Sequence, residues 1–479
     1  MIYGAERRAL PPAVLPIRGW RGIVSSMSGK RRTIVGLDWR LAAALAFFAG
    51  TRLALLFLYD HYWSDTPLYR MAAALVVKGH YIPYHDFKFP YPPLSLPLVV
   101  VPFLLAEGMT AYRFVFQCEM ALFDIAALAY VLMFAGRAGL GDAGKAAAVA
   151  LYAVLGLALG HLIYDRLDVA LAVVFIGIAY HLSAPSNSGE RCKRAVEWRL
   201  ASLLNCMGAL LKIVPALLVP VHVIVEFFAG GGKRPRDAIR PFAFIVVPFV
   251  LLMFIVDRAT FNEKHRIGLI SSMAEHGERG IQMESSWATP FMLRNAAAKT
   301  RGDEIPYPIR TNHGAQHLDD SAVPKSVLLL SKYAGFALLA VLQLAVGLWL
   351  FARPGVRGAV SDPVWILSFV TACLLTTIAT QRVFSPQYAV WLLPSAAILP
   401  FAARSASDRW PAAVLSAVIV LTFMVFDYGY EGLVCSRPGA VGLAAARNAL
   451  CLVCAAVFAL RLFKWRPVGD GSVSEEVEQ

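Results

Sequence analysis

The sequence is poor in charged residues. Only 16% of its 479 residues are Asp, Glu, Lys or Arg, whereas 58% are hydrophobic and the mean hydropathy is +0.58. Soluble domains usually carry about 25% charged residues. Roughly a dozen apolar runs approach the ~20 residues that cross a bilayer as a helix, and a backbone in hydrocarbon must satisfy its own hydrogen bonds. The composition therefore excludes an ordinary soluble domain and predicts an all-α, polytopic membrane protein.

Cysteine is scarce as well. The chain has seven cysteines, and only Cys435 falls in a clear extracytosolic loop. An odd number of mostly intramembrane cysteines argues against a disulfide framework. Cys451 and Cys454 form a C-x-x-C within an apolar run. Two small buried residues are expected there rather than a redox or zinc pair.

The start of the chain lacks the pattern of a cleavable signal peptide. Residues 1–40 are rich in arginine and lysine, and no apolar core precedes Leu41. This segment is predicted to be a disordered basic arm that holds the N-terminus in the cytoplasm, with Met27 as an alternative start. The tail 464–479 is predicted to be disordered and cytoplasmic too.

The net charge of +13 does not indicate nucleic acid, because no basic stripe with interleaved aromatics lies outside the apolar runs. Most basic residues fall in short segments between those runs, as in cytoplasmic loops. All these segments fall on one side if about twelve helices cross the membrane and the short run 94–105 lies at the interface. Spans are expected at 41–59, 112–135, 145–162, 166–182, 199–228 (two short spans), 241–256, 326–351, 363–380, 386–401, 411–426 and 441–460.

Two large polar segments then lie on the extracytosolic side, at 60–93 and 258–324. Most of the histidines and many acids fall in them. We therefore expect one transmembrane domain, 41–463, whose polar chemistry faces outward.

Asp65 follows the first span in a segment of aromatics and prolines. A carboxylate at a membrane interface can have a raised pKa and act as a general base. The alternative is a capping role for a helix near 67–78, with Pro67 in its first turn and Thr66 or Asp65 as the cap.

Asp165, Arg166 and Asp168 lie in a short turn between two spans. Charges at the end of an apolar helix are costly unless they are hydrated, paired or functional. A helix cap with a local ion pair is the alternative to a functional role.

Lys212 stands alone between apolar runs, just before Pro215. It is a candidate phosphate ligand, and a lysine that extends to the membrane interface is the alternative.

The second polar segment contains Arg279 and Glu284, which either bind phosphate and sugar hydroxyls or form a solvated ion pair. His313 and His317 have the i, i+4 spacing of a helical metal site, but Gly314 intervenes and no helix is evident, so metal binding is disfavoured.

Arg382 precedes SPQYAVWLLP, at the mouth of a span where a lipid phosphate would lie. Tyr388 and Trp391 in the same block also fit an interfacial aromatic belt.

The order of these blocks is more specific than any one of them. An Asp after the first span in D-x-x-x-Y is followed by YPPLSLPL, DRLDVAL, LLKIVPALL, ERGIQMESSW and VFSPQYAVWLLP. From about 41 to 400 the chain resembles the GT-C superfamily of polyprenyl-phosphate-sugar-dependent glycosyltransferases. It is most similar to glycosyltransferase family 87, which includes mannosyltransferases of mycobacterial phosphatidylinositol mannoside and lipomannan synthesis.

The resemblance implies inverting transfer of a hexose, most simply mannose, from a polyprenyl-phosphate donor to a hydroxyl of a lipid-linked or cell-envelope glycan on the outer face of the cell membrane. It implies Asp65 as the general base and Lys212 and Arg382 as ligands of the donor phosphate. Contacts to substrate are expected from Tyr69, Tyr91, Asp165, Arg166, Asp168, Arg279, Glu284 and Gln387.

The chain departs from this pattern at Pro90, where relatives carry Glu before YPPL, and Asp86 is a candidate substitute. No nucleotide site or cofactor is expected, since the lipid donor supplies its own leaving group. The alternatives are an arabinosyl or glucosyl transferase on the same scaffold and a glycan or lipid transporter.

Overall fold

The computed structural model describes residues 38–58, 65–184, 191–274, 277, 279–312, 314–403 and 406–466. The predicted basic arm lies outside these residues except for its last three positions, and so does most of the predicted tail. The helices that lie in the predicted spans are α2 (Trp39–Phe57), α5 (Met109–Arg137), α6 (Asp142–Ala158), α7 (Asp168–Leu182), α8 (Arg191–Leu211), α9 (Val219–Ala229), α10 (Arg236–Thr260), α13 (Lys325–Ala352), α14 (Pro363–Thr380), α15 (Ala389–Ala402), α16 (Ala406–Phe423) and α18 (Pro438–Leu462).

Further helices and a pair of strands lie between them. The α-helices are α3 (Thr66–Val77), α4 (Ser95–Leu105), α11 (Leu269–Ala274), α12 (Thr289–Arg301) and α17 (Tyr430–Val434), and the strands are β1 (Ile309–Asn312) and β2 (Ala315–Leu318). The 3-10 turns are η2 (Gly160–Ile163), η4 (Val214–Leu218), η6 (Pro354–Ser361) and η7 (Pro386–Tyr388), and α16 is followed by a π-helical turn, η8 (Met424–Tyr428).

The mostly helical, polytopic architecture is confirmed. Within the described ranges, seven helical segments are long and apolar enough to cross a membrane: α2, α5, α10, α13, α14, Arg409–Tyr428 and α18. Helices also occupy the other expected spans, but they are shorter or less apolar. The number of twelve crossings therefore stays a prediction.

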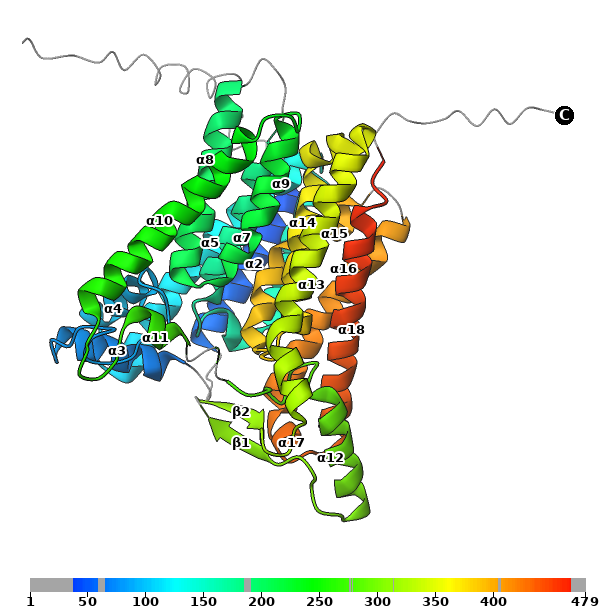
Figure 1. Cartoon of the computed structure of the whole chain (residues 1–479). Coiled ribbons are helices and arrows are strands. Elements are labelled where there is room, and N and C mark those ends of the chain that lie inside the picture. The colour runs from blue at the N-terminus through cyan, green and yellow to red at the C-terminus, as the bar shows by residue number, and fades with distance from the viewer. Residues whose placement is uncertain are drawn as a thin grey trace, which may run out of the picture.

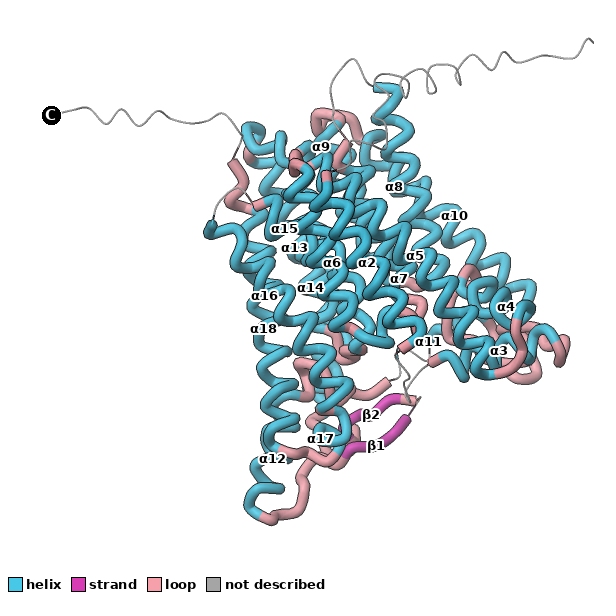
Figure 2. The backbone as a smooth tube through the Cα atoms, turned by 180° about the vertical axis from the view of Figure 1, so that it is seen from behind, coloured by secondary structure: helices cyan, strands magenta, loops and turns pink. Residues whose placement is uncertain are grey.

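The two ends of the bundle differ in architecture. Figures 1 and 2 show α3, α4, α11, α12, α17 and the β1–β2 hairpin gathered at one end, which we call the hairpin end. The two strands pair antiparallel around Gly314, whose φ of +71° suits glycine. Elements of the two long polar segments thus lie at the same end of the bundle, and the extracytosolic location of that end stays a prediction.

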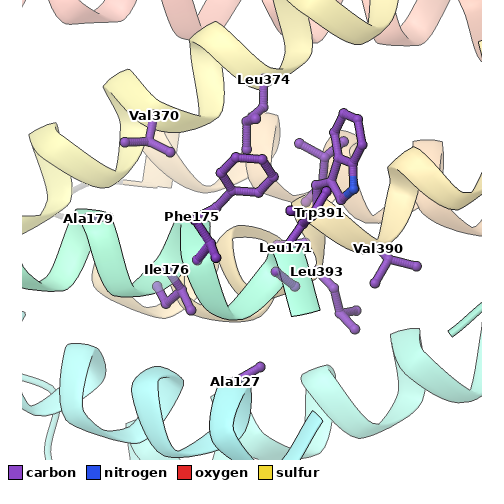
Figure 3. Close-up of a cluster of buried hydrophobic side chains, with 14 of the residues drawn as sticks. Ala127, Leu171, Phe175, Ile176, Ala179, Val370, Leu374, Val390, Trp391 and Leu393 are labelled. Carbon is purple, nitrogen blue, oxygen red and sulfur yellow. The ribbon is translucent and has the colours of Figure 1, made fainter. Parts of the chain in front are cut away.

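Helix α7 is the centre of the core. Its apolar residues surround the whole helix, and 13 of its 15 residues are buried within the protein. Figure 3 shows Leu171, Phe175 and Ile176 of this helix between α14 and α15 on one side and α5 on the other. The side chain of Phe175 packs edge-on against Trp391, with ring centroids 5.7 Å apart.

Several helix boundaries differ from the prediction for physical reasons. The basic segment at 191–199 was expected to be a loop but is the start of α8, where Arg194 pairs with Glu226 of α9 at 2.7 Å. The expected break in 199–228 is present, because α8 ends at Leu211 and η4 begins before Pro215. Helices α7 and α15 begin later than predicted, which leaves Arg166 and Gln387 outside regular α-helix.

Candidate functional site

Charged and aromatic side chains converge where several helices stop at the hairpin end. They come from the start of α3, the segment before α4, the turn before α7, the break after α8 and the turn η7. We call this group the Arg166 cluster; it contains Asp65, Tyr69, Tyr91, Arg166, Asp168, Lys212 and Tyr388. Most of these groups lie within a few residues of a helix end or of a break between helices.

Asp65 occupies the N-cap position of α3, and a proline follows in the first turn. Its side chain makes no capping bond to the described backbone of that helix. Instead Arg166 donates a hydrogen bond to Asp65 Oδ2, and the two side chains are 14% and 22% exposed. The capping interpretation is therefore right about position and wrong about the carboxylate, which remains reachable from solvent.

Arg166 keeps its charge although most of its side chain is buried. Burial works against the charged guanidinium, but the carboxylate of Asp65, followed by the tyrosines Tyr69 and Tyr91, raises its pKa overall. A cation held in this way orients the Asp65 carboxylate without consuming all of its acceptor sites.

Lys212 forms the second ion pair of the cluster. Its Nζ lies 2.8 Å from Asp168 Oδ1, and the same oxygen accepts a hydrogen bond of 2.7 Å from the indole nitrogen of Trp391. The ammonium also lies 5.3 Å from the centre of the Tyr388 ring. With a side chain only 16% exposed, Lys212 is not a lysine extended into the interface. The aromatic-belt interpretation is wrong for Trp391, which is buried and packs on Tyr388 at 4.3 Å.

Tyr91 links the two ion pairs. Its pKa is raised by burial and then by the charge of Asp65, while the charge of Lys212 lowers it. Its hydroxyl is 3.4 Å from that of Tyr69, whose pKa is also raised by burial. Arg166 and Asp168, which make one ion pair each, are only two residues apart in the chain, so the two ion pairs belong to one site.

The three charges of the DRLD turn point in different directions. Asp165 accepts hydrogen bonds from Arg113 at 2.8 Å and from Gln117 at 2.8 Å, both on α5. Arg166 reaches Asp65, and Asp168 reaches Lys212. The predicted local ion pair is therefore wrong: each of these charges bonds to a distant segment.

Glu284 is buried beside the cluster. Burial raises its pKa to about 7, while the charges of Arg447 and Arg166 lower it. Its carboxyl accepts a hydrogen bond of 3.1 Å from Gln282, and Asn448 donates one of 3.1 Å to its backbone carbonyl. A solvated pair with Arg279 is thus excluded by the burial of Glu284. Arg279 is half-buried, and its charge lowers the pKa of Tyr388, which burial raises.

The side chains of Arg382 and Gln387 form hydrogen bonds to residues outside the Arg166 cluster. Arg382 donates to the Gly277 carbonyl, and its pKa is lowered by burial, while the charge of Asp320 raises it. Gln387 accepts a hydrogen bond from Ser385 within its own turn. Tyr388, Arg166 and Arg279 accompany Lys212, whereas Arg382 lies toward the second polar segment.

Two secondary candidates are placed away from the cluster. Asp86 is exposed and bonds to the backbone of Ile82 at 2.7 Å and to His85 at 2.8 Å. His317 lies in strand β2, so its spacing from residue 313 is that of a hairpin and not of a helix; His313 itself is outside the described residues.

Sequence reasoning missed the residues that support the cluster from inside the helices. Arg447 and Asn448 of α18 both donate to the Glu284 carbonyl. Arg113 and Gln117 of α5 hold Asp165. The available signal was a polar residue inside an apolar run, which is costly unless it has a partner.

Comparison with known proteins adds little. No family model matches the chain, and no curated protein matches it. Two solved structures are similar to it, each at 14% sequence identity over 88% of this chain and 76% of the other. They are ArnT from Cupriavidus metallidurans in the apo state, with a TM-score of 0.43, and the same protein bound to undecaprenyl phosphate, with a TM-score of 0.44. Similarity at this level carries no argument about what this chain binds or does.

Proposed function

We propose that this protein is a membrane glycosyltransferase of the GT-C type, most similar to family 87. It transfers a hexose, in the first instance mannose, from a polyprenyl-phosphate donor to a hydroxyl of a lipid-linked or cell-envelope glycan. The reaction inverts the anomeric centre and takes place on the extracytosolic face of the cell membrane. The observation that carries the proposal is the geometry of the turn before α7, where Arg166 bonds to the Asp65 carboxylate and Asp168, two residues on, bonds to the Lys212 ammonium at 2.8 Å.

The chemistry needs two opposite groups. The acceptor oxygen forms a bond to the anomeric carbon while the bond from that carbon to the phosphate oxygen breaks. Asp65 takes the acceptor proton, and polyprenyl phosphate departs with the electron pair of the broken bond. Lys212, with Arg166 and Arg279 nearby, stabilises the negative charge on that phosphate.

The location of the site suits a lipid donor. The cluster lies where apolar helices end, so a polyprenyl chain can stay in hydrocarbon while its phosphate meets Lys212. The tyrosines provide flat faces and hydroxyls of the kind that contact sugar rings. Arg382 stays a proposed ligand of the donor phosphate, on the side of the second polar segment.

The test is transfer of radiolabelled mannose from polyprenyl-phosphate mannose to membrane lipid by the purified protein. The Asp65→Asn variant keeps the side-chain shape and removes the base, and transfer should fall roughly 10²–10⁴-fold. Asp86→Asn is the matched control, an exposed carboxylate in the same polar segment, and it should keep full transfer.

Unchanged transfer by Asp65→Asn would remove this carboxylate from the mechanism. Absence of label with the unmodified protein would reject mannose as the donor sugar. Repetition with arabinose- and glucose-linked donors then separates the related transferases from a transporter, which would move lipid without forming a new glycosidic bond.

A further inference from the structure

Helix α5 carries a stripe of polar residues that faces the site from within the bundle. Arg113, Gln117 and Asp124 are separated by four and seven residues, which places them on one face of the helix. Gln117 and Asp124 are buried, and Asp124 has no exposed surface. Charged groups so deep in an apolar helix are expensive unless they bond to something.

All three residues bond toward the turn that precedes α7. Arg113 and Gln117 hold the carboxylate of Asp165. The Tyr164 hydroxyl donates to Asp124 Oδ2 at 2.8 Å. The two consecutive residues 164 and 165 are therefore fixed to α5 by side-chain hydrogen bonds.

The next charged residues turn toward the site. Arg166 donates to Asp65, and Asp168 accepts from Lys212. The short turn thus has one end anchored on α5 and the other end carrying a partner for each ion pair of the Arg166 cluster. Movement at the anchored end would shift both pairs together.

Asp124 has its charge balanced by a separate helix. Arg52 of α2 approaches Asp124 Oδ2 at 2.6 Å and also donates to the carbonyl of Ala153 at 3.0 Å. The hydroxyl of Tyr152, on α6, donates to the other carboxylate oxygen at 2.7 Å. Two tyrosines therefore bond to one buried carboxylate, but only one of them belongs to the turn.

We propose that Asp124, through Tyr164, is a positioning residue that sets Arg166 and Asp168 for transfer, an inference that rests on the proposed function. The anchor acts on geometry, because neither Asp124 nor Tyr164 reaches the Arg166 cluster itself. A misplacement of about 1 Å in such a site costs up to about 10²-fold in rate.

The pair of tyrosines provides a matched experiment. Tyr164→Phe and Tyr152→Phe each delete one hydroxyl from the same carboxylate. Tyr164→Phe should lower kcat roughly tenfold or more, whereas Tyr152→Phe should keep kcat within about twofold. The thermal midpoints of the two variants should fall by similar amounts, since each loses one buried hydrogen bond.

A second measurement does not depend on activity. Amide hydrogen exchange of peptides covering 160–170 should quicken in Tyr164→Phe and stay unchanged in Tyr152→Phe. If the unmodified protein transfers no sugar, the proposed function fails and the exchange experiment alone decides whether Tyr164 anchors the turn.

Two results would overturn the inference. One is an equal loss of kcat in both variants that follows their loss of stability, which would make the network purely structural. The other is unchanged exchange at 160–170 in Tyr164→Phe, which would show that the hydroxyl does not hold the turn.

Discussion

Two arginine–aspartate pairs of this protein differ in what surrounds them. Arg52 and Asp124 meet at 2.6 Å with side chains 6% and 0% exposed, and Tyr152, Tyr164 and a backbone carbonyl fill further hydrogen-bonding positions. Arg166 and Asp65 also form an ion pair, but their side chains are 14% and 22% exposed.

The difference distinguishes an ion pair that supports the fold from one whose carboxylate can take part in catalysis. A carboxylate that already accepts bonds from an arginine and two tyrosines, with no exposed surface, has no access for a substrate hydroxyl. Asp65 is oriented by one guanidinium and keeps exposed surface where an acceptor can approach. The degree to which a buried charge is already satisfied is thus a better guide to function than the presence of the charge.

The largest expected effect comes from breaking the ion pair of Arg52 and Asp124, which we call the closed pair because Asp124 has no exposed surface. Arg52→Ala leaves Asp124 buried without its counter-ion, which should cost about 3–5 kcal/mol of unfolding free energy. Arg166→Ala removes the partner of a carboxylate that solvent reaches, so the loss of stability should be clearly smaller while transfer is lost. Chemical unfolding in detergent micelles, followed by circular dichroism, measures the first, and the transfer assay measures the second. Equal destabilisation by the two substitutions would remove the distinction between the pairs.

Lys212 tests the Arg166 cluster, whose charged groups are expected to contact substrate. If it holds the donor phosphate, Lys212→Ala should raise the KM for polyprenyl-phosphate sugar roughly 10–100-fold, the value of one hydrogen bond to a charged group. The KM for the acceptor should change much less. Lys78→Ala is the control, because Lys78 lies in the first polar segment and pairs with Glu107 on an exposed surface. An unchanged donor KM in Lys212→Ala would limit this lysine to pairing with Asp168.

The sequence predicted the helices well because long uncharged runs can be little else in a membrane. It also singled out the residues that form the Arg166 cluster. The wrong predictions concern the bonding partners of individual side chains. Asp165, Arg166 and Asp168 are neighbours in the chain, yet each bonds to a different segment, and no local pattern specifies which.

The supporting network was beyond sequence reasoning for a related reason. Arg52 was recognisable as a charge within an apolar run, but its partner lies 72 residues away on another helix. A single sequence read by itself offers no means of pairing such residues. The β1–β2 hairpin was missed because the polar segment around Gly314 lacks the alternating apolar pattern of a strand.

Glycine 156 gives a smaller test of the closed pair. A Cβ atom built at Gly156 of α6 would lie 2.7 Å from Cζ of Arg52, whose guanidinium is held by Asp124 and by the Ala153 carbonyl. Gly156→Ala should therefore destabilise the protein by roughly 1–3 kcal/mol, as overpacking does.

Gly50→Ala is the matched control for that substitution, because Gly50 lies within α2 and, beyond the adjacent backbone of that helix, no described residue comes within 4 Å of its Cβ position. Thermal unfolding of the two variants makes the comparison. A neutral Gly156→Ala would mean that the Arg52 side chain can move aside and that the closed pair is less rigid than its contacts indicate.

Glu284 is a third kind of buried charge and gives the smallest expected effect, a change in pH dependence. Unlike Asp124, its carboxyl meets a neutral amide, since Arg447 donates to the backbone carbonyl instead. Burial raises its pKa to about 7 from the ordinary value of 4.5, so the folded protein holds a proton that the unfolded chain has released between these two pH values. Its contribution to stability is therefore complete below about pH 4.5 and is lost as the pH rises through about 7. Glu284→Gln keeps the neutral shape and cannot ionise, so the decline in stability over this range should become shallower in unfolding experiments repeated at several pH values. The same decline in the variant would assign that pH dependence to other groups and would place Glu284 with the fully compensated charges, beside Asp124.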